Sequence, residues 1–140
     1  MKSLIKKTVF LFIVISIASL IFTGCSQNGT YVVSKITKTD NMETIVLNIK
    51  EYDYMTASQK LLADIYKDKT INVKGHNIKI LSGKNDTNVK TYGFEIKNDD
   101  MLFDDPLMNN SETKYTFSNG KIYLTFAQLN SVYEIEFKKA

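Results

Sequence analysis

Apolar and polar residues alternate in short runs through most of the chain after residue 30. In the run 92–96, large apolar residues occupy every second position: Tyr92, Phe94 and Ile96. A period of two places these side chains on one face of an extended strand, so each such run predicts a strand with one buried face. Runs of the same character lie at 31–37, 43–50, 71–73, 78–80, 115–117, 122–124 and 133–137. We therefore expect about eight short strands.

The period changes once, between residues 56 and 67, where the pattern favours a helix. Thr56 followed by Gln59 has the spacing of a capping box, in which each side chain bonds the backbone N–H of the other residue. The apolar stripe that follows consists of Ala57, Leu61 and Ile65, widened by Leu62 and Tyr66. We expect one amphipathic helix at 57–67, with this stripe against the core.

Asn119-Gly120 is a strong signal for a two-residue type I′ turn, because both central positions of that turn need positive φ. Such a turn pairs Ser118 with Lys121 and so sets the register of the two strands. The apolar residues then meet on one face in two pairs, Phe117 with Ile122 and Tyr115 with Leu124. A second hairpin turn is expected at 74–77, where the sequence reads Lys-Gly-His-Asn.

These elements predict one mainly β domain at 30–140. Short antiparallel strands joined by short loops favour a small antiparallel barrel or a strongly curved sheet, with one amphipathic helix. The alternative is an open α+β sheet with the helix packed on one face. About 115 residues suffice for one modest core without disulfides.

The first 24 residues differ in character from the rest. Residues 1–7 are basic, 8–22 are uncharged and mostly aliphatic, and Thr23-Gly24 precedes the only cysteine, Cys25. This arrangement resembles a bacterial lipoprotein signal peptide with its lipobox. The resemblance implies that 1–24 are removed and that Cys25 is acylated on sulfur. It also implies a lipid-anchored protein on the extracytoplasmic face of the cell membrane.

Residues 25–29 are then the lipidated cysteine and a short tether. A membrane-spanning helix is the other interpretation, but the 17 residues at 8–24 are short against the roughly 20 that a span needs. The full chain has 18 lysines, no arginine and 15 acidic residues. Three of the lysines lie within 1–24, so a chain that begins at Cys25 carries 15 lysines and 15 acidic residues. A neutral domain without arginine lacks the basic surface of nucleic-acid-binding proteins, so no nucleic-acid partner is expected.

Gly29-Thr30-Tyr31 opens the first predicted strand, and the last one reads Tyr-Glu-Ile-Glu-Phe-Lys at 133–138. With about eight antiparallel strands between them, this layout resembles small lipocalin-like lipoproteins. In that family a Gly-x-Trp motif opens the first strand; here Tyr31 stands in the Trp position. The resemblance implies a barrel that holds a small apolar ligand. The ligand-binding candidates are Tyr31, Phe94, Met101, Phe103, Tyr115 and Phe117.

Residues for catalysis or metal binding are scarce. His76 is the only histidine and lies in a predicted turn, and no second histidine or cysteine follows Cys25 to complete a zinc site. The polar stretch 85–88 lacks the spacing and terminal Glu of a calcium loop. No pair of carboxylates stands out as a glycosidase site. We therefore expect no catalytic residues, no metal and no cofactor.

Segment 99–110 mixes acidic pairs with large apolar residues and contains the only proline. It can form a mouth loop over a ligand cavity or an exposed ridge with adaptable methionines. We favour a structural role, in which Met101, Phe103 and Leu107 turn inward and close one end of the core.

The sequence favours a non-enzymatic, monomeric binding module for a small apolar ligand or an envelope component. The alternative is an inhibitor or immunity-type lipoprotein that binds another protein at the cell surface, and a small hydrolase is a third hypothesis. A large enclosed apolar cavity would favour the first function. A filled core with an exposed apolar patch would favour the second.

Overall fold

The computed structural model describes residues 27–140. The predicted signal peptide and Cys25 lie outside the described residues. The elements in chain order are β1 (Gly29–Thr39), β2 (Thr44–Asn48), the 3-10 helix η1 (Ile49–Tyr54), α2 (Ala57–Tyr66), β3 (Thr70–Lys74), β4 (Asn77–Leu81), β5 (Thr91–Lys97), β6 (Asp100–Phe103), the 3-10 helix η2 (Pro106–Met108), β7 (Thr113–Ser118), β8 (Lys121–Gln128) and β9 (Ser131–Lys139).

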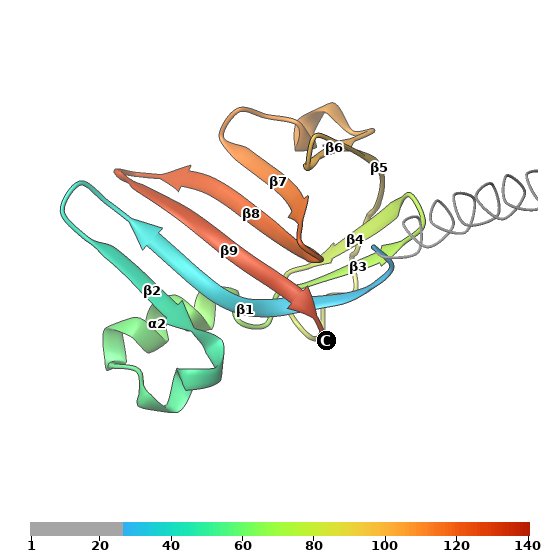
Figure 1. Cartoon of the computed structure of the whole chain (residues 1–140). Coiled ribbons are helices and arrows are strands. Elements are labelled where there is room, and N and C mark those ends of the chain that lie inside the picture. Colours follow the sequence, from blue (N-terminus) through green and yellow to red (C-terminus); the bar gives the residue numbers. More distant parts are fainter. Residues whose placement is uncertain (1–26) are drawn as a thin grey trace, which may run out of the picture.

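Antiparallel pairing closes β1 and β3 to β9 into a barrel, which Figure 1 shows as a strongly curved sheet. The long strand β1 closes the ring: Gly29 to Val32 pair with β3, while the other edge of β1 pairs with β9. The mainly β fold class is confirmed, and the open α+β sheet is wrong because both edges of β1 are paired.

A register shift between Val33 and Lys35 bends β1 away from β3. Such a bulge adds one residue to a strand and increases its local twist. Beyond the bulge, β1 pairs with β2 instead of β3, through residues 35–39. β2 is the ninth strand of the described sheet and pairs with β1 alone.

The predicted hairpins are confirmed. Asn119 and Gly120 have φ of 53° and 73°, and Ser118 pairs with Lys121 as expected. Lys74 pairs with Asn77 across the turn between β3 and β4. The strand that the pattern did not predict is β6, in which Met101 and Phe103 point inward.

The core of the described barrel is filled with side chains. One cluster of seventeen buried apolar residues has members in each of the nine described strands and in α2. Its largest fully buried members are Tyr31, Ile36, Ile71, Ile78, Ile122, Ile135 and Phe137. All cluster members lie between residues 31 and 137. A chain that starts at residue 26 therefore contains the whole core.

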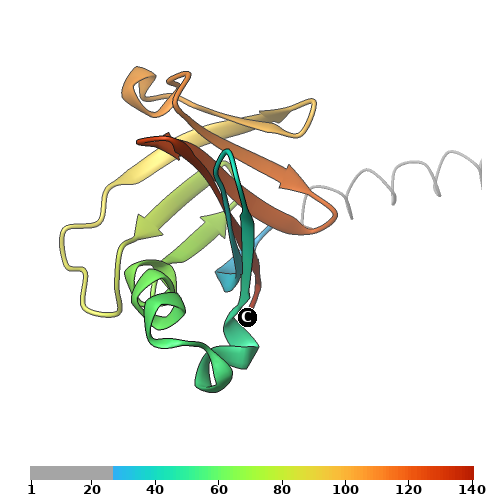
Figure 2. The same ribbon diagram turned by 90° about the vertical axis from the view of Figure 1, so that its left-hand side faces the viewer.

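Helix α2 has the predicted capping box, but it buries only the Leu62 and Tyr66 side of the predicted stripe, together with Ala63. Figure 2 shows the helix at one end of the barrel, where Tyr66 contacts Phe126 and Tyr133 with ring centroids 5.9 and 6.3 Å away. Leu61 and Ile65 from the predicted stripe are 71% and 62% exposed. Apolar residues occur on both sides of this helix, and the buried side is the one on which the Tyr66 ring packs against two aromatic rings of the barrel.

Candidate binding surfaces

The two ends of the barrel differ in their relation to the N-terminus. β1 runs from one end of the barrel to the other, and because all strand pairs are antiparallel, the direction of each later strand follows from that of β1. We call the end where β1 begins the near end; it carries the β3–β4, β5–β6 and β7–β8 turns. The opposite, far end carries the β1–β2, β4–β5, β6–β7 and β8–β9 connections. In Figure 1 the β1–β2 and β8–β9 turns lie together, away from the start of β1.

Large apolar side chains are exposed at the far end. Met42 in the β1–β2 turn is 96% exposed and Leu129 in the β8–β9 turn is 97% exposed. On the outer face just below them, Val46 and Val132 are 57% and 49% exposed. Thr39 joins the two strands that carry these valines, because it pairs with both Val132 and Thr44. We call Met42, Val46, Leu129 and Val132 the far-end patch.

The free edge of β2 runs beside the far-end patch. The backbone N–H of Asp40 donates to the carbonyl oxygen of Glu43 at 3.0 Å, so Asp40 and Glu43 form a hydrogen-bonded pair of the ladder. Hydrogen-bonded and non-hydrogen-bonded pairs alternate in an antiparallel ladder, so the backbone groups of Thr44, Val46 and Asn48 point away from β1. The strand has no proline or charged residue, which are the usual protection of an exposed edge. A hollow of about 110 Å³ adjoins it, lined by Val46, Leu47, Asn48, Glu51, Tyr54, Met55 and Gln59.

Glu136 organises the charged part of the same outer face. Its carboxylate accepts a 2.6 Å hydrogen bond from the Ser34 hydroxyl and lies 3.2 and 3.5 Å from the ammonium groups of Lys121 and Lys35. Burial raises the pKa of Glu136, but the hydrogen bonds from Ser34 and Lys121 and the lysine charges together bring the pKa below its ordinary value. The carboxylate therefore stays ionised and ties β1, β8 and β9 together.

A second hollow lies where β6 and β7 separate. One residue pair, Asp100 with Thr116, joins these strands. Beyond it, the side chain of Asn109 bonds the backbone of Phe103: its Oδ1 accepts from the N–H at 2.8 Å, and its Nδ2 donates to the C=O at 2.5 Å. The resulting groove of about 220 Å³ has Met101, Met108 and Tyr115 among its lining residues. Burial raises the pKa of Tyr115 to about 12, so the groove contains a neutral phenol.

The predicted ligand residues do not surround a common cavity. Tyr31 is fully buried and its ring meets Phe117 edge-on at 6.4 Å. Of the six candidates, Met101 and Tyr115 line the groove at β6 and β7. Phe94 and Phe103 border a separate surface hollow of about 400 Å³. Within segment 99–110, Met101 and Phe103 are buried as predicted, whereas Leu107 is 83% exposed and does not close the core.

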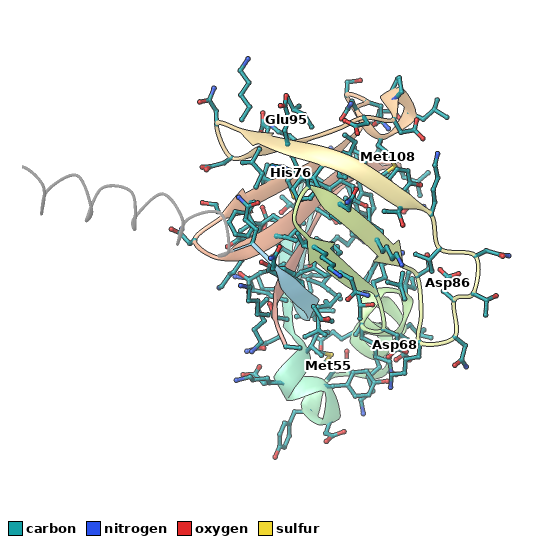
Figure 3. All side chains as sticks on the ribbon, turned by 90° about the vertical axis from the view of Figure 1, so that its right-hand side faces the viewer. Met55, Asp68, His76, Asp86, Glu95 and Met108 are labelled. Carbon is teal, nitrogen blue, oxygen red and sulfur yellow. The ribbon has the colours of Figure 1, made fainter. Side chains whose placement is uncertain are left out.

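His76 lies in the exposed β3–β4 turn and borders the same hollow as Glu95 and Asp104. Figure 3 shows His76 and Glu95 on the side of the barrel formed by β4 and β5. Between residues 27 and 140, no group of three potential metal ligands comes together. None of the helices in that range is long and apolar enough to cross a membrane.

The far-end patch was not among the predicted site residues. Met42 and Leu129 are single apolar residues inside polar turns, and such positions give no periodic signal in the sequence. No protein-family model, no curated protein and no solved structure matches this chain.

Proposed function

We propose that this protein is a lipid-anchored, non-enzymatic module that binds another protein of the cell envelope through its far-end patch. One observation carries the proposal: the barrel interior is packed with side chains, while Met42 and Leu129 stand almost fully exposed. A filled core leaves little room for an enclosed ligand, and clustered exposed apolar residues mark protein interaction sites.

The position of the predicted lipid anchor supports an orientation in which the far-end patch points away from the membrane. Gly29, the first residue of β1, follows Cys25 by four residues. Four extended residues reach about 14 Å, so a lipid on Cys25 holds the near end close to the bilayer. The far-end patch then faces away from the membrane, toward proteins of the envelope or the surroundings.

The edge of β2 supports a specific mode of binding. An extended segment of a partner can pair with the outward backbone groups of Thr44, Val46 and Asn48, as in other cases of strand addition. Its side chains then reach the hollow between Leu47 and Met55. Backbone pairing supplies affinity and the hollow supplies selectivity.

Site-specific crosslinking in the producing cell tests the proposal. A photoreactive amino acid is placed at Met42 in the full chain, and at Thr91, an exposed position on β5, as the matched control. We expect a discrete protein adduct from position 42 that is absent from position 91. The adduct is also expected to disappear when Leu129→Ser is added. Equal crosslinking from both positions, or none from position 42, contradicts the proposal.

A small apolar ligand in the groove between β6 and β7 is the second candidate function. The groove favours it because Met101, Met108 and Tyr115 offer apolar contact beside the polar side chains of Asn110 and Lys114. Two single variants test it. Tyr115→Phe leaves the shape of the groove unchanged, whereas Met108→Ala widens the groove. Saturable binding of an apolar dye that weakens only with Met108→Ala identifies this groove as the site.

A further inference from the structure

The near end of the barrel is rich in lysine. Strand ends and turns place five lysines there, namely Lys74, Lys97, Lys121, Lys138 and Lys139. The acidic side chains of the near-end turns are Asp99 and Asp100. The far-end connections carry acidic residues such as Asp40, Glu43, Asp105 and Glu112 beside two lysines, Lys84 and Lys90. Glu95 and Asp104 border the hollow next to the near-end residue His76. Residues 25–140 are neutral as a whole, so any attraction to an anionic surface must come from lysines that are locally unpaired.

Local pairing leaves the excess positive charge at the near end in place. Asp100 is already bound by Lys114 on the side wall at 2.9 Å. Glu136 is shared by two lysines, Lys35 and Lys121. Among the described residues, Lys74, Lys97 and Lys138 have no acidic partner within ion-pair distance.

Lys139, at the end of β9, packs against the first residues of β1. Its ammonium group lies 5.8 Å from the centroid of the Tyr31 ring. Its aliphatic carbons approach within 3.4 Å of the position where a side chain on Gly29 would begin. The lysine stem therefore packs against the start of β1, and the positive charge lies where the tether leaves the barrel.

We propose that the near end docks on anionic phospholipid headgroups and fixes the barrel upright on the bilayer. The inference rests on the lipid anchor of the proposed function, because a tether of about 14 Å keeps these lysines near the surface. That reach is comparable to the Debye length of about 8–10 Å at physiological salt, so the lysines feel the charge of the headgroups. Since the chain after residue 24 is neutral overall, the attraction comes from the unpaired near-end lysines Lys74, Lys97 and Lys138, and their position orients the molecule.

The test uses the full, lipidated chain in vesicles of phosphatidylcholine alone or with phosphatidylglycerol at a 7:3 ratio. A donor fluorophore is attached to His76→Cys at the near end or to Met42→Cys at the far end, with an acceptor on the lipid headgroups. We expect energy transfer from position 76 to rise when phosphatidylglycerol is present and to fall again in 0.5 M salt. Transfer from position 42 is expected to stay low.

Two double variants separate the lysine cluster from net charge. Lys74→Gln with Lys97→Gln removes two near-end charges, and Lys50→Gln with Lys84→Gln removes two exposed charges elsewhere. Each lysine near an anionic surface contributes about fivefold to binding, so the near-end pair is expected to lower the ratio of docked to undocked barrels roughly 25-fold. The control pair is expected to leave that ratio within about twofold.

Sedimentation of the same vesicles distinguishes the two ways of failing. If the chain sediments with both kinds of vesicle but energy transfer from position 76 is the same with and without phosphatidylglycerol, the docking is overturned and the anchor stands. A chain that sediments with neither vesicle overturns the anchor, and the docking with it.

Discussion

Gly120→Ala tests the two-residue turn between β7 and β8, in which Asn119 and Gly120 both have positive φ. Gly120 has φ of +73°, and a Cβ built on it meets no atom within 4 Å. The effect of the substitution is therefore conformational and not a clash. A residue with a Cβ costs about 1–2 kcal/mol in the left-handed region, while loss of glycine's freedom in the unfolded chain returns about 0.4–1 kcal/mol. We expect a net destabilisation of about 0.5–1 kcal/mol.

Gly83 provides the matched control, because a Cβ there also meets nothing within 4 Å and its φ lies outside the left-handed region. Gly83→Ala is expected to be neutral or to stabilise by up to about 1 kcal/mol. The two variants should therefore differ by roughly 0.5–2 kcal/mol, which corresponds to about 2–8 °C in Tm for a domain of this size. Thermal unfolding of the chain from residue 26 measures the difference. Equal Tm values for both variants would refute the assignment of positive φ at Gly120.

Three further predictions concern the core, the helix and the charged cluster. Tyr66→Ala should lower the free energy of unfolding by about 3 kcal/mol, whereas Leu61→Ala on the exposed face should change it by less than about 0.5 kcal/mol. The reverse order in denaturant unfolding would show that Leu61, and not Tyr66, faces the core. Thr56→Ala should cost about 1 kcal/mol through loss of the cap, compared with no loss for the exposed Thr87→Ala, and similar chemical midpoints for both would count against the capping box. Because the pKa of Glu136 is lowered in the folded state, its stabilising contribution is full above the ordinary glutamate pKa and is lost as the pH falls through the lower folded value. The difference in stability between the native chain and Glu136→Gln should therefore shrink as the pH is lowered from 6 to 3, and a difference that is constant with pH would exclude this linkage.

Local signals made much of the fold predictable from the sequence. The Asn119-Gly120 turn fixes its own register, because the turn type and the alternation of the flanking strands agree. The capping box at Thr56 and Gln59 likewise depends on residues three positions apart. Strands such as β5 and β9 have a clean period of two, which a half-buried strand requires.

Features that depend on distant partners were not predictable in the same way. β6 is four residues long, too short for a clear period, and its backbone is held by pairing with β5 and by the side chain of Asn109. The orientation of α2 was set by Phe126 and Tyr133, about sixty residues further along the chain. For the candidate site, the predicted aromatic residues formed core, and the exposed far-end residues carried no pattern.

Titration of the chain from residue 26 with a fluorescent fatty acid tests most directly whether the barrel is a packed protein-binding module. Among the described residues, the cluster around Tyr31, Ile71 and Phe137 is almost fully buried, which leaves little enclosed space for an acyl chain. We therefore expect a weak signal that rises linearly with ligand and does not saturate. Saturable binding with one ligand per barrel that Met108→Ala leaves unchanged would exclude the groove between β6 and β7, show a hollow interior and contradict the proposed function.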